Sequence, residues 1–198
     1  MLRVAHIFFV CFVLTSYQTF ATDPIVETNA DPIVVNDVAF MKLGTYRGFT
    51  DDGTEYQKSF FVQRYSTAPW AESKAICKAF DMDLFSFETL AESRAFLNMI
   101  DTNSVLIKTY PLWIWLDGIA LTGKSKTDWY WSKSGKKVTF PMDWYVNSPG
   151  SIDQFCLCIG RQTLTTTSGF NDCYCYDAYK IACQRIEFFL SSMDKNLN

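Results

Sequence analysis

Apolar residues recur along this chain at two different spacings, which predicts a domain that combines strands and helices. The run from 56 to 62 is rich in aromatic and β-branched residues, as in a strand, and a turn sequence at 51–53 precedes it. Between 69 and 100 the apolar spacing becomes three and four, which is typical of helices. Short aromatic runs separated by glycines follow. The order of strand, two helices and further strands indicates an α+β layout.

Two helices are predicted between 69 and 100. Pro69 suits the first turn of the first helix, with Thr67 or Ser66 as its capping residue. One face of this helix then carries Trp70, Ser73, Cys77 and Phe80. The residues from Thr89 to Glu92 form a capping box for a second helix. The residues expected in the core lie on that helix or between the two: Leu84, Phe85, Phe87, Phe96, Met99 and Ile100.

The second half of the chain predicts short strands and one long loop. Aromatic or β-branched runs occur at 113–116, 128–132, 137–140 and 179–186. A polar connection from Pro141 to Gln154 separates the third run from the cysteine-rich segment. Trp113 and Trp129 are expected to pack in the core. Three aromatic residues near the loop are candidates for contact with a sugar or a protein, although burial is the safer expectation for each: Tyr145, Phe155 and Tyr174.

Both ends of the chain predict segments outside the folded domain. Arg3, the apolar run at 7–14 and the small residues that end at Ala21 form the pattern of a secretory signal peptide. The apolar run is too short to cross a bilayer, which needs about 20 residues. We therefore expect a signal peptide at 1–21, an extended tail or linker at 22–44, a domain at 45–187 and a C-terminal tail at 188–198. The chain is expected to be secreted, with no membrane span.

Charge and histidine content exclude several classes of function. The formal net charge of −3 argues against nucleic acid, whose affinity comes largely from Lys and Arg on phosphates. The only histidine, His6, lies in the predicted signal peptide, so the mature chain has no Ser-His-Asp or Cys-His pair. The sequence therefore predicts a protein that is not an enzyme. One enzymatic alternative stays open, because two carboxylates alone support glycoside hydrolysis.

Six cysteines remain after the signal peptide, and an even number in an exported chain indicates disulfides. Two of them form Cys-x-Cys pairs at 156–158 and 173–175, so each pair shares one face of a strand. An antiparallel register that sets Cys156 opposite Cys175 also sets Cys158 opposite Cys173. The remaining bridge is then Cys77–Cys183. The alternative is a zinc site made of four thiolates.

In this order and spacing the motifs resemble the C-type lectin-like domain, over about Tyr46 to Arg185. The segment 113–116 (Trp-Ile-Trp-Leu) is similar to the family's Trp-Ile-Gly-Leu strand, and 170–175 (Phe-Asn-Asp-Cys-Tyr-Cys) to its Trp-Asn-Asp-x-x-Cys. Further matches lie at 70–77, 84, 129–135, 143–144 and 180–183. The resemblance implies a disulfide-stapled α+β fold with two helices, antiparallel sheets and a long loop. It implies the bridges Cys77–Cys183 and Cys156–Cys175, with Cys158–Cys173 as an additional one.

In sugar-binding members of that family, one calcium ion bridges the protein and the carbohydrate. The resemblance places its ligands at Ser148, Gln154, Asn171 and Asp172 in this chain, where Ser148-Pro149-Gly150 replaces a Glu-Pro-Asn or Gln-Pro-Asp triplet. Calcium requires six to eight oxygens, with carboxylates prominent, and Asp172 is the only carboxylate at a matched position. We expect calcium-dependent sugar binding to be lost or much reduced. The alternatives are a residual metal role for Asn171 and Asp172 and a substitute ligand in Asp153.

These observations predict a secreted binding protein. Its expected ligand is a glycan, recognised as in the family or by a degenerate version that does not need calcium. The alternative is an extracellular protein-binding or structural matrix component without sugar binding. No cofactor is firmly expected.

Overall fold

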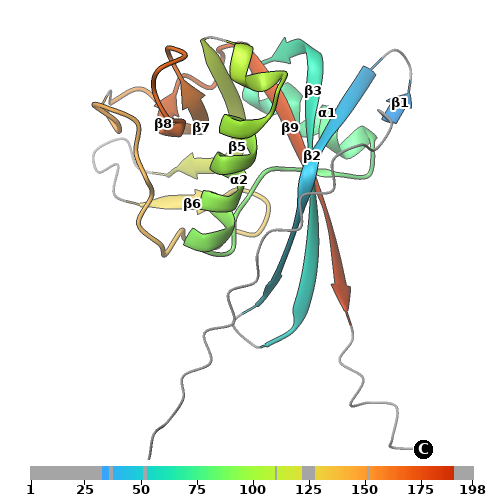
Figure 1. Ribbon diagram of the computed structural model, residues 1–198. Coiled ribbons are helices and arrows are strands. Elements are labelled where there is room, and N and C mark those ends of the chain that lie inside the picture. The colour runs from blue at the N-terminus through green and yellow to red at the C-terminus, as the bar shows by residue number, and fades with distance from the viewer. Residues whose placement is uncertain are drawn as a thin grey trace, which may run out of the picture.

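The computed structural model describes residues 33–35, 38–50, 53–109, 111–121, 128–150 and 152–189 (Figure 1). The predicted signal peptide and most of the predicted tails lie outside these residues. The helices are α1 (Trp70–Ala79), α2 (Leu90–Thr102) and a short 3-10 helix, η1 (Leu106–Lys108). The strands are β1 (Ile33–Val35), β2 (Val38–Phe49), β3 (Glu55–Ala68), β4 (Asp83–Leu84), β5 (Leu112–Ala120), β6 (Trp129–Trp131), β7 (Cys156–Arg161), β8 (Gly169–Cys173) and β9 (Tyr179–Phe189).

These strands form one mixed sheet with the order β1-β2-β3-β9-β5-β7-β8, and β4 and β6 add to β9 and β5. Among the strands of the described residues, only β5 and β9 pair in parallel, and they meet at the pair Ile114–Lys180. The strands β2, β3 and β9 extend together well beyond the rest of the molecule (Figure 1). The pairing of β3 with β9 brings the start of the domain beside its end. The α+β class that the sequence predicts is confirmed.

The folded sheet begins before residue 45, where the sequence places the start of the domain. The strand β2 starts at Val38 and pairs with β3 from Phe40 to Phe49, so residues 38–44 belong to the sheet and not to a linker. Phe40 is fully buried and stacks edge-on against Phe80 at the end of α1, with 5.1 Å between ring centroids. Burial of this aromatic ring holds the segment in the sheet, because a ring of this size stabilises folding by roughly 1.5–3 kcal/mol.

The sheet is buried on both faces, and the alternation of side chains divides the core into two clusters. Along β5, Ile114 and Leu116 face one cluster, while Trp115 faces the other. Along β7, Leu157 and Ile159 face the first cluster and the two cysteines face the second. The first cluster packs against α2 and the second against α1, so the helices cover opposite faces of the sheet.

The two helices begin differently from the prediction. Pro69 itself is the N-cap of α1 and makes no side-chain cap bond, while Thr67 pairs with Lys180 as part of β3. The first free amide of α1, at Trp70, instead donates to the carbonyl oxygen of Cys175 at 3.0 Å. In α2 half of the predicted capping box is confirmed, because the hydroxyl of Thr89 accepts from the Glu92 amide at 3.1 Å.

The Glu92 carboxylate does not return to Thr89 but lies in a buried polar cluster. Its Oε1 lies 2.6 Å from Nζ of Lys58, and both side chains are fully buried. Its Oε2 accepts from the hydroxyl of Tyr56 at 3.1 Å and from the amide of Glu88 at 2.7 Å. The Lys58 ammonium also donates to the carbonyl oxygen of Ser86 at 3.0 Å. These contacts fix the start of α2 to β3, because a buried charge is tolerated only when it is paired and hydrogen-bonded.

All six cysteines of the described chain form the three predicted disulfides: Cys77–Cys183, Cys156–Cys175 and Cys158–Cys173. The alternative of a four-thiolate zinc site is therefore wrong. The register expected from the sequence between the two cysteine-containing strands is wrong by two residues. Cys156 lies opposite Cys173, and Cys158 lies opposite Asn171.

The bridges consequently run diagonally between β7 and the end of β8, with Cα–Cα distances of 5.2 and 6.2 Å. Both distances lie within the range of a disulfide. A shift of two residues keeps every cysteine on the same face of its strand, so the face-sharing argument holds in either register.

Two aromatic segments depart from the prediction in detail. Residues 137–140 do not form a strand, and one bridge joins Tyr130 to Lys137 while Val138 packs into the core. Trp129 is fully buried as expected, whereas Trp113 is only partly buried and packs at the border of the second cluster.

Candidate functional site

The long loop that leaves β6 returns along the outer strand of the sheet. The amide of Phe170 in β8 donates to the carbonyl oxygen of Asp143 at 2.9 Å, and the amide of Tyr145 donates to Phe170 at 2.7 Å. Arg94 on α2 adds a two-pronged hydrogen bond to the Asp143 carboxylate, at 2.8 and 3.2 Å. This partner lowers the pKa of Asp143, with the Arg94 charge acting in the same direction. The loop is thereby tied to both β8 and α2.

The tip of this loop is bonded to the Asp172 side chain. The backbone amide of Gly150 donates to both carboxylate oxygens of Asp172, each at 3.1 Å. Asp172 is only 1% exposed, because it lies in β8 opposite Leu157 of β7. A carboxylate in this position needs hydrogen-bond donors, and a backbone amide of the loop supplies one.

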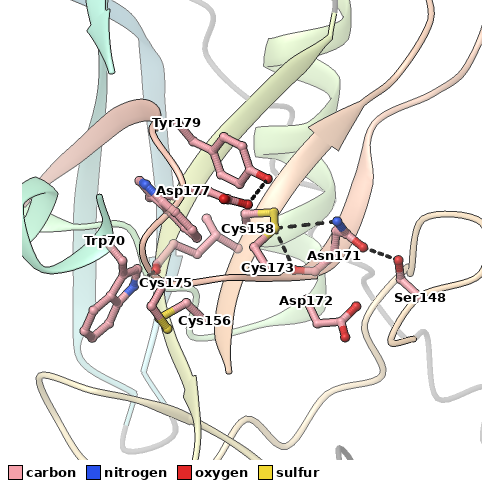
Figure 2. The surroundings of a disulfide bond; sticks show 12 residues. Trp70, Ser148, Cys156, Cys158, Asn171, Asp172, Cys173, Cys175, Asp177 and Tyr179 are labelled. Atoms are coloured by element: carbon pink, nitrogen blue, oxygen red, sulfur yellow. Dashed lines mark hydrogen bonds between the residues drawn. A yellow bond between two sulfur atoms is a disulfide. The ribbon is translucent and has the colours of Figure 1, made fainter. Parts of the chain in front are cut away.

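A second contact joins the loop to the neighbouring residue of the strand. The hydroxyl of Ser148 donates to Oδ1 of Asn171, and Nδ2 of Asn171 lies 3.5 Å from the sulfur of Cys173. Figure 2 shows Ser148, Asn171 and Asp172 together beside the Cys158–Cys173 bridge. The peptide bond between Ser148 and Pro149 is cis. Three of the four predicted site residues therefore lie together.

Gln154 lies just before β7 and is partly buried. Asp153 beside it is exposed and makes an interaction of its own. Within the described part of the chain, no hydrogen bond links Gln154 to the contacts of Ser148, Asn171 and Asp172.

The residues at this site do not fit a calcium ion of the kind that the resemblance implies. Calcium prefers six to eight oxygens, several of them from carboxylates. Here the two oxygens of Asp172 accept from Gly150, and Oδ1 of Asn171 accepts from Ser148. The described residues contain no group of three or more His, Cys, Asp or Glu side chains placed to hold a metal. The oxygens that remain from the family's site thus serve the protein's own loop.

Apolar side chains flank these contacts on the surface. Val146 is 71% exposed and Ile152 is 70% exposed, one on each side of the segment 148–150. Tyr145 is partly buried and lies edge-on to Trp113, with 5.6 Å between ring centroids. Phe155 and Tyr174, the other two candidate aromatic residues, are also partly buried. The surface beside the loop therefore has apolar and aromatic character.

No protein-family model matches the sequence, and no curated protein matches it closely enough to serve as a relative. Solved structures do resemble the fold. The C-type lectin domain of murine dendritic cell inhibitory receptor 2, solved with an N-glycan, superposes with a TM-score of 0.53 and 19% identity. The match covers 66% of this chain and 91% of that domain. SPL-1 in complex with GlcNAc gives a TM-score of 0.50 and 18% identity, covering 65% of this chain and 87% of that one.

The chain folds as a C-type lectin-like domain. The likeness is one of fold, because the sequence identities are below one fifth. Within this lectin-like domain, the bridges Cys77–Cys183 and Cys156–Cys175 are the two that the resemblance implies. No helix of the described chain is long and apolar enough to cross a membrane.

The sequence does not reveal the hydrogen-bond donor to the Asp172 carboxylate, because that donor is a backbone amide. Gly150 has no side-chain oxygen to offer a metal, and its backbone amide makes the contact with Asp172. The small size of Gly150 serves the loop itself, because a Cβ at this position would lie 2.9 Å from the carbonyl oxygen of Asn147. The spacing of residues along the sequence does not indicate the hydrogen bonds between Arg94 and Asp143.

Proposed function

We propose that this lectin-like domain is a secreted binding protein that recognises glycans without calcium. The surface that would do so is formed by the described loop residues 145–150 and Ile152 and by Asn171 and Asp172. The observation that carries this proposal is the double contact of the Gly150 amide with the Asp172 carboxylate. That contact holds the loop in place by a protein group, where the family would use a metal.

The neighbours in fold support a glycan as the ligand class, because two of them were solved with an N-glycan or with GlcNAc. The three disulfides support export, since such bonds persist in oxidising compartments. The fold also supports a binding role over an enzymatic one. Recognition here would rest on hydrogen bonds and aromatic contacts, which supply orientation in sites of this kind.

A glycan array with the full secreted chain tests this proposal. Binding should be equal in the presence of calcium and in the presence of a chelator. An Asn171→Ala variant should bind more weakly than the wild type in both conditions, because it removes the amide at the surface of the site. Loss of binding on chelation would contradict the proposal, as would the absence of any glycan bound above background.

Protein binding is the second candidate function, and one observation favours it. The side chains of Val146 and Ile152 are exposed beside the site. Sugar hydroxyls gain little from such aliphatic groups, whereas protein interfaces bury them. A Val146→Ser and Ile152→Ser double variant separates the two functions. It should retain glycan binding under the first proposal and lose binding to an extracellular protein under the second.

A further inference from the structure

A second site lies on the α1 side of the sheet, away from the long loop. A pocket of about 370 Å³ lies between α1, β4, β5 and the turn after β6. Five of its seven lining residues carry charged side chains: Lys74, Lys78, Asp83, Asp117 and Lys133. Ala75 and Leu84 complete the lining. The pocket shares no residue with the long-loop site, and it falls in the size range of small-ligand sites.

The floor of this pocket is a buried carboxylate. Asp117 is only 2% exposed and accepts from the hydroxyl of Ser132 at 2.6 Å and from the amide of Lys133 at 2.7 Å. The Lys74 ammonium lies 3.1 Å from the same carboxylate and also donates to the Ser132 hydroxyl. The ring of Trp70 lies 4.7 Å from this ammonium. Lys74 is therefore fixed in position at the edge of the pocket.

The charges in the pocket do not cancel. Asp117 is matched by Lys74, and Asp83 forms an ion pair with Lys133. The side chain of Lys78 on α1 is exposed and makes no ion pair or hydrogen bond within the described part of the chain. One full positive charge is thus left over in a protein whose net charge is negative. A concave site with an unmatched ammonium group attracts an anion.

The same pocket also offers hydrogen-bond acceptors. The Asp83 side chain is 25% exposed, so its carboxylate is partly open to solvent and accepts from hydroxyl groups. Each ammonium provides three N–H donors, and Lys133 uses only part of them on Asp83. The lysine ammonium groups can bind a negative substituent, and the Asp83 carboxylate beside them can accept from hydroxyl groups. A hydroxylated ring with a negative substituent therefore fits the pocket better than a bare ion does.

From this arrangement we infer a binding site for an acidic sugar, with its sulfate or carboxylate group at Lys78 and Lys133 and its hydroxyls at Asp83. Lys74, held by Asp117, lies at the edge of the site. Sulfate esters and uronic acids share the required chemistry. The inference is independent of the proposed function, because neither site contributes a residue to the other.

Titration calorimetry of the full secreted chain tests this site, with galactose 6-sulfate, galacturonate, galactose and inorganic sulfate as separate probes. We expect at least one of the two acidic sugars to bind. Galactose and inorganic sulfate should each bind about tenfold more weakly, which corresponds to about 1.4 kcal/mol. Added salt should weaken binding of the acidic sugar, because the contacts are partly exposed. If inorganic sulfate binds as tightly as the sugars, the site holds an adventitious ion only and the inference is overturned.

The Lys78→Gln variant locates the site. Lys78 is exposed and unpaired within the described chain, so the variant should keep its fold and bind the acidic sugar about tenfold more weakly. The matched control is Lys108→Gln, which makes the same charge change on η1, outside the pocket. Equal weakening by both variants would mean that only net charge matters, and it would overturn the inference. Binding unaffected by Lys78→Gln would do the same.

Discussion

At the scale of single residues, the sequence identifies the important side chains but not their partners. Asn171 and Asp172 are recognisable from the motif that contains them, and the structure places both beside the long loop. Their partners are a serine hydroxyl and a glycine amide, which carry no residue-specific pattern. The same limit applies to Glu92. Its place at the start of a helix predicts a cap, yet its carboxylate pairs with Lys58 from a strand 34 positions earlier.

Removal of the Asp172 carboxylate should loosen the loop tip. We expect Asp172→Ala to lower the free energy of unfolding by about 1.5–3 kcal/mol, as for a hydrogen bond to a charged group. Asp172→Asn should cost less, because it keeps one oxygen acceptor. Hydrogen exchange of the Gly150 amide is the direct measurement, and it should be slow in the wild type and fast in Asp172→Ala. Equal exchange rates in the two proteins would contradict the observed contact.

The buried ion pair between Lys58 and Glu92 predicts a contrast between two variants. Glu92→Gln should lower the free energy of unfolding by about 3–5 kcal/mol, because it leaves a buried ammonium without its partner. A Lys58→Met and Glu92→Leu double variant should cost less, since it removes both charges from the interior. Chemical denaturation of the two proteins measures the difference. A double variant less stable than Glu92→Gln would contradict this prediction.

At the scale of elements, the sequence predicts which residues share one face of a strand better than it predicts the register between two strands. The Cys-x-Cys pattern places the cysteines of each pair on one face, which is compatible with the observed bonds, but the choice of Cys156–Cys175 and Cys158–Cys173 rested on the expected register and on the family resemblance. The register itself differs by two residues, and the diagonal pairs still have Cα–Cα distances of 5.2 and 6.2 Å, which a disulfide can span. The start of β2 was missed for a related reason. The prolines that precede this strand, Pro24 and Pro32, and their polar neighbours suggest a linker, and the burial of Phe40 outweighs them.

The tie between α2 and the long loop predicts a pH dependence. Hydrogen bonding to Arg94 holds the pKa of Asp143 below its ordinary value, so the unfolded chain takes up this proton first as the pH falls. The stability that this pair contributes is present above the ordinary aspartate pKa of about 3.9 and is lost as the pH falls through the lower, folded value.

The Arg94→Gln variant tests this dependence. Loss of the Arg94 guanidinium should raise the pKa of Asp143 toward the ordinary aspartate value, and NMR of the carboxyl carbon measures this pKa. The matched control is Arg47→Gln, since Arg47 bonds to Gln57 between β2 and β3 and does not contact the loop. An unchanged pKa of Asp143 in Arg94→Gln would show that the pair does not form in solution.

At the scale of the whole molecule, the disulfides join regions of very different separation. The Cys77–Cys183 bond spans 106 positions and ties α1 to β9, whereas Cys158–Cys173 spans only 15. Because a cross-link restricts the unfolded chain more when its loop is longer, removal of the first should cost about 4.7 kcal/mol and removal of the second about 3 kcal/mol. Paired Cys→Ala variants in chemical denaturation measure both costs. The reverse order would contradict this account of the fold.

The overall architecture was within reach of the sequence because several weak signals agree with one another. Alternating apolar residues on β5 and β7, two amphipathic helices and six cysteines all indicate one disulfide-stapled α+β domain. The chemistry of the binding surface was less accessible, since it depends on how a loop folds back over β8. That folding rests on backbone contacts such as those of Asp143 and Tyr145 with Phe170.

The most direct test of the central claim is a calcium titration of the full secreted chain by calorimetry. The account predicts no calcium site of millimolar or tighter affinity, because the Asp172 carboxylate is bonded to Gly150 and the neighbouring amide oxygen to Ser148. A sub-millimolar site that disappears in Asp172→Ala would contradict the claim. It would show that the metal, and not the loop amide, holds the binding surface together.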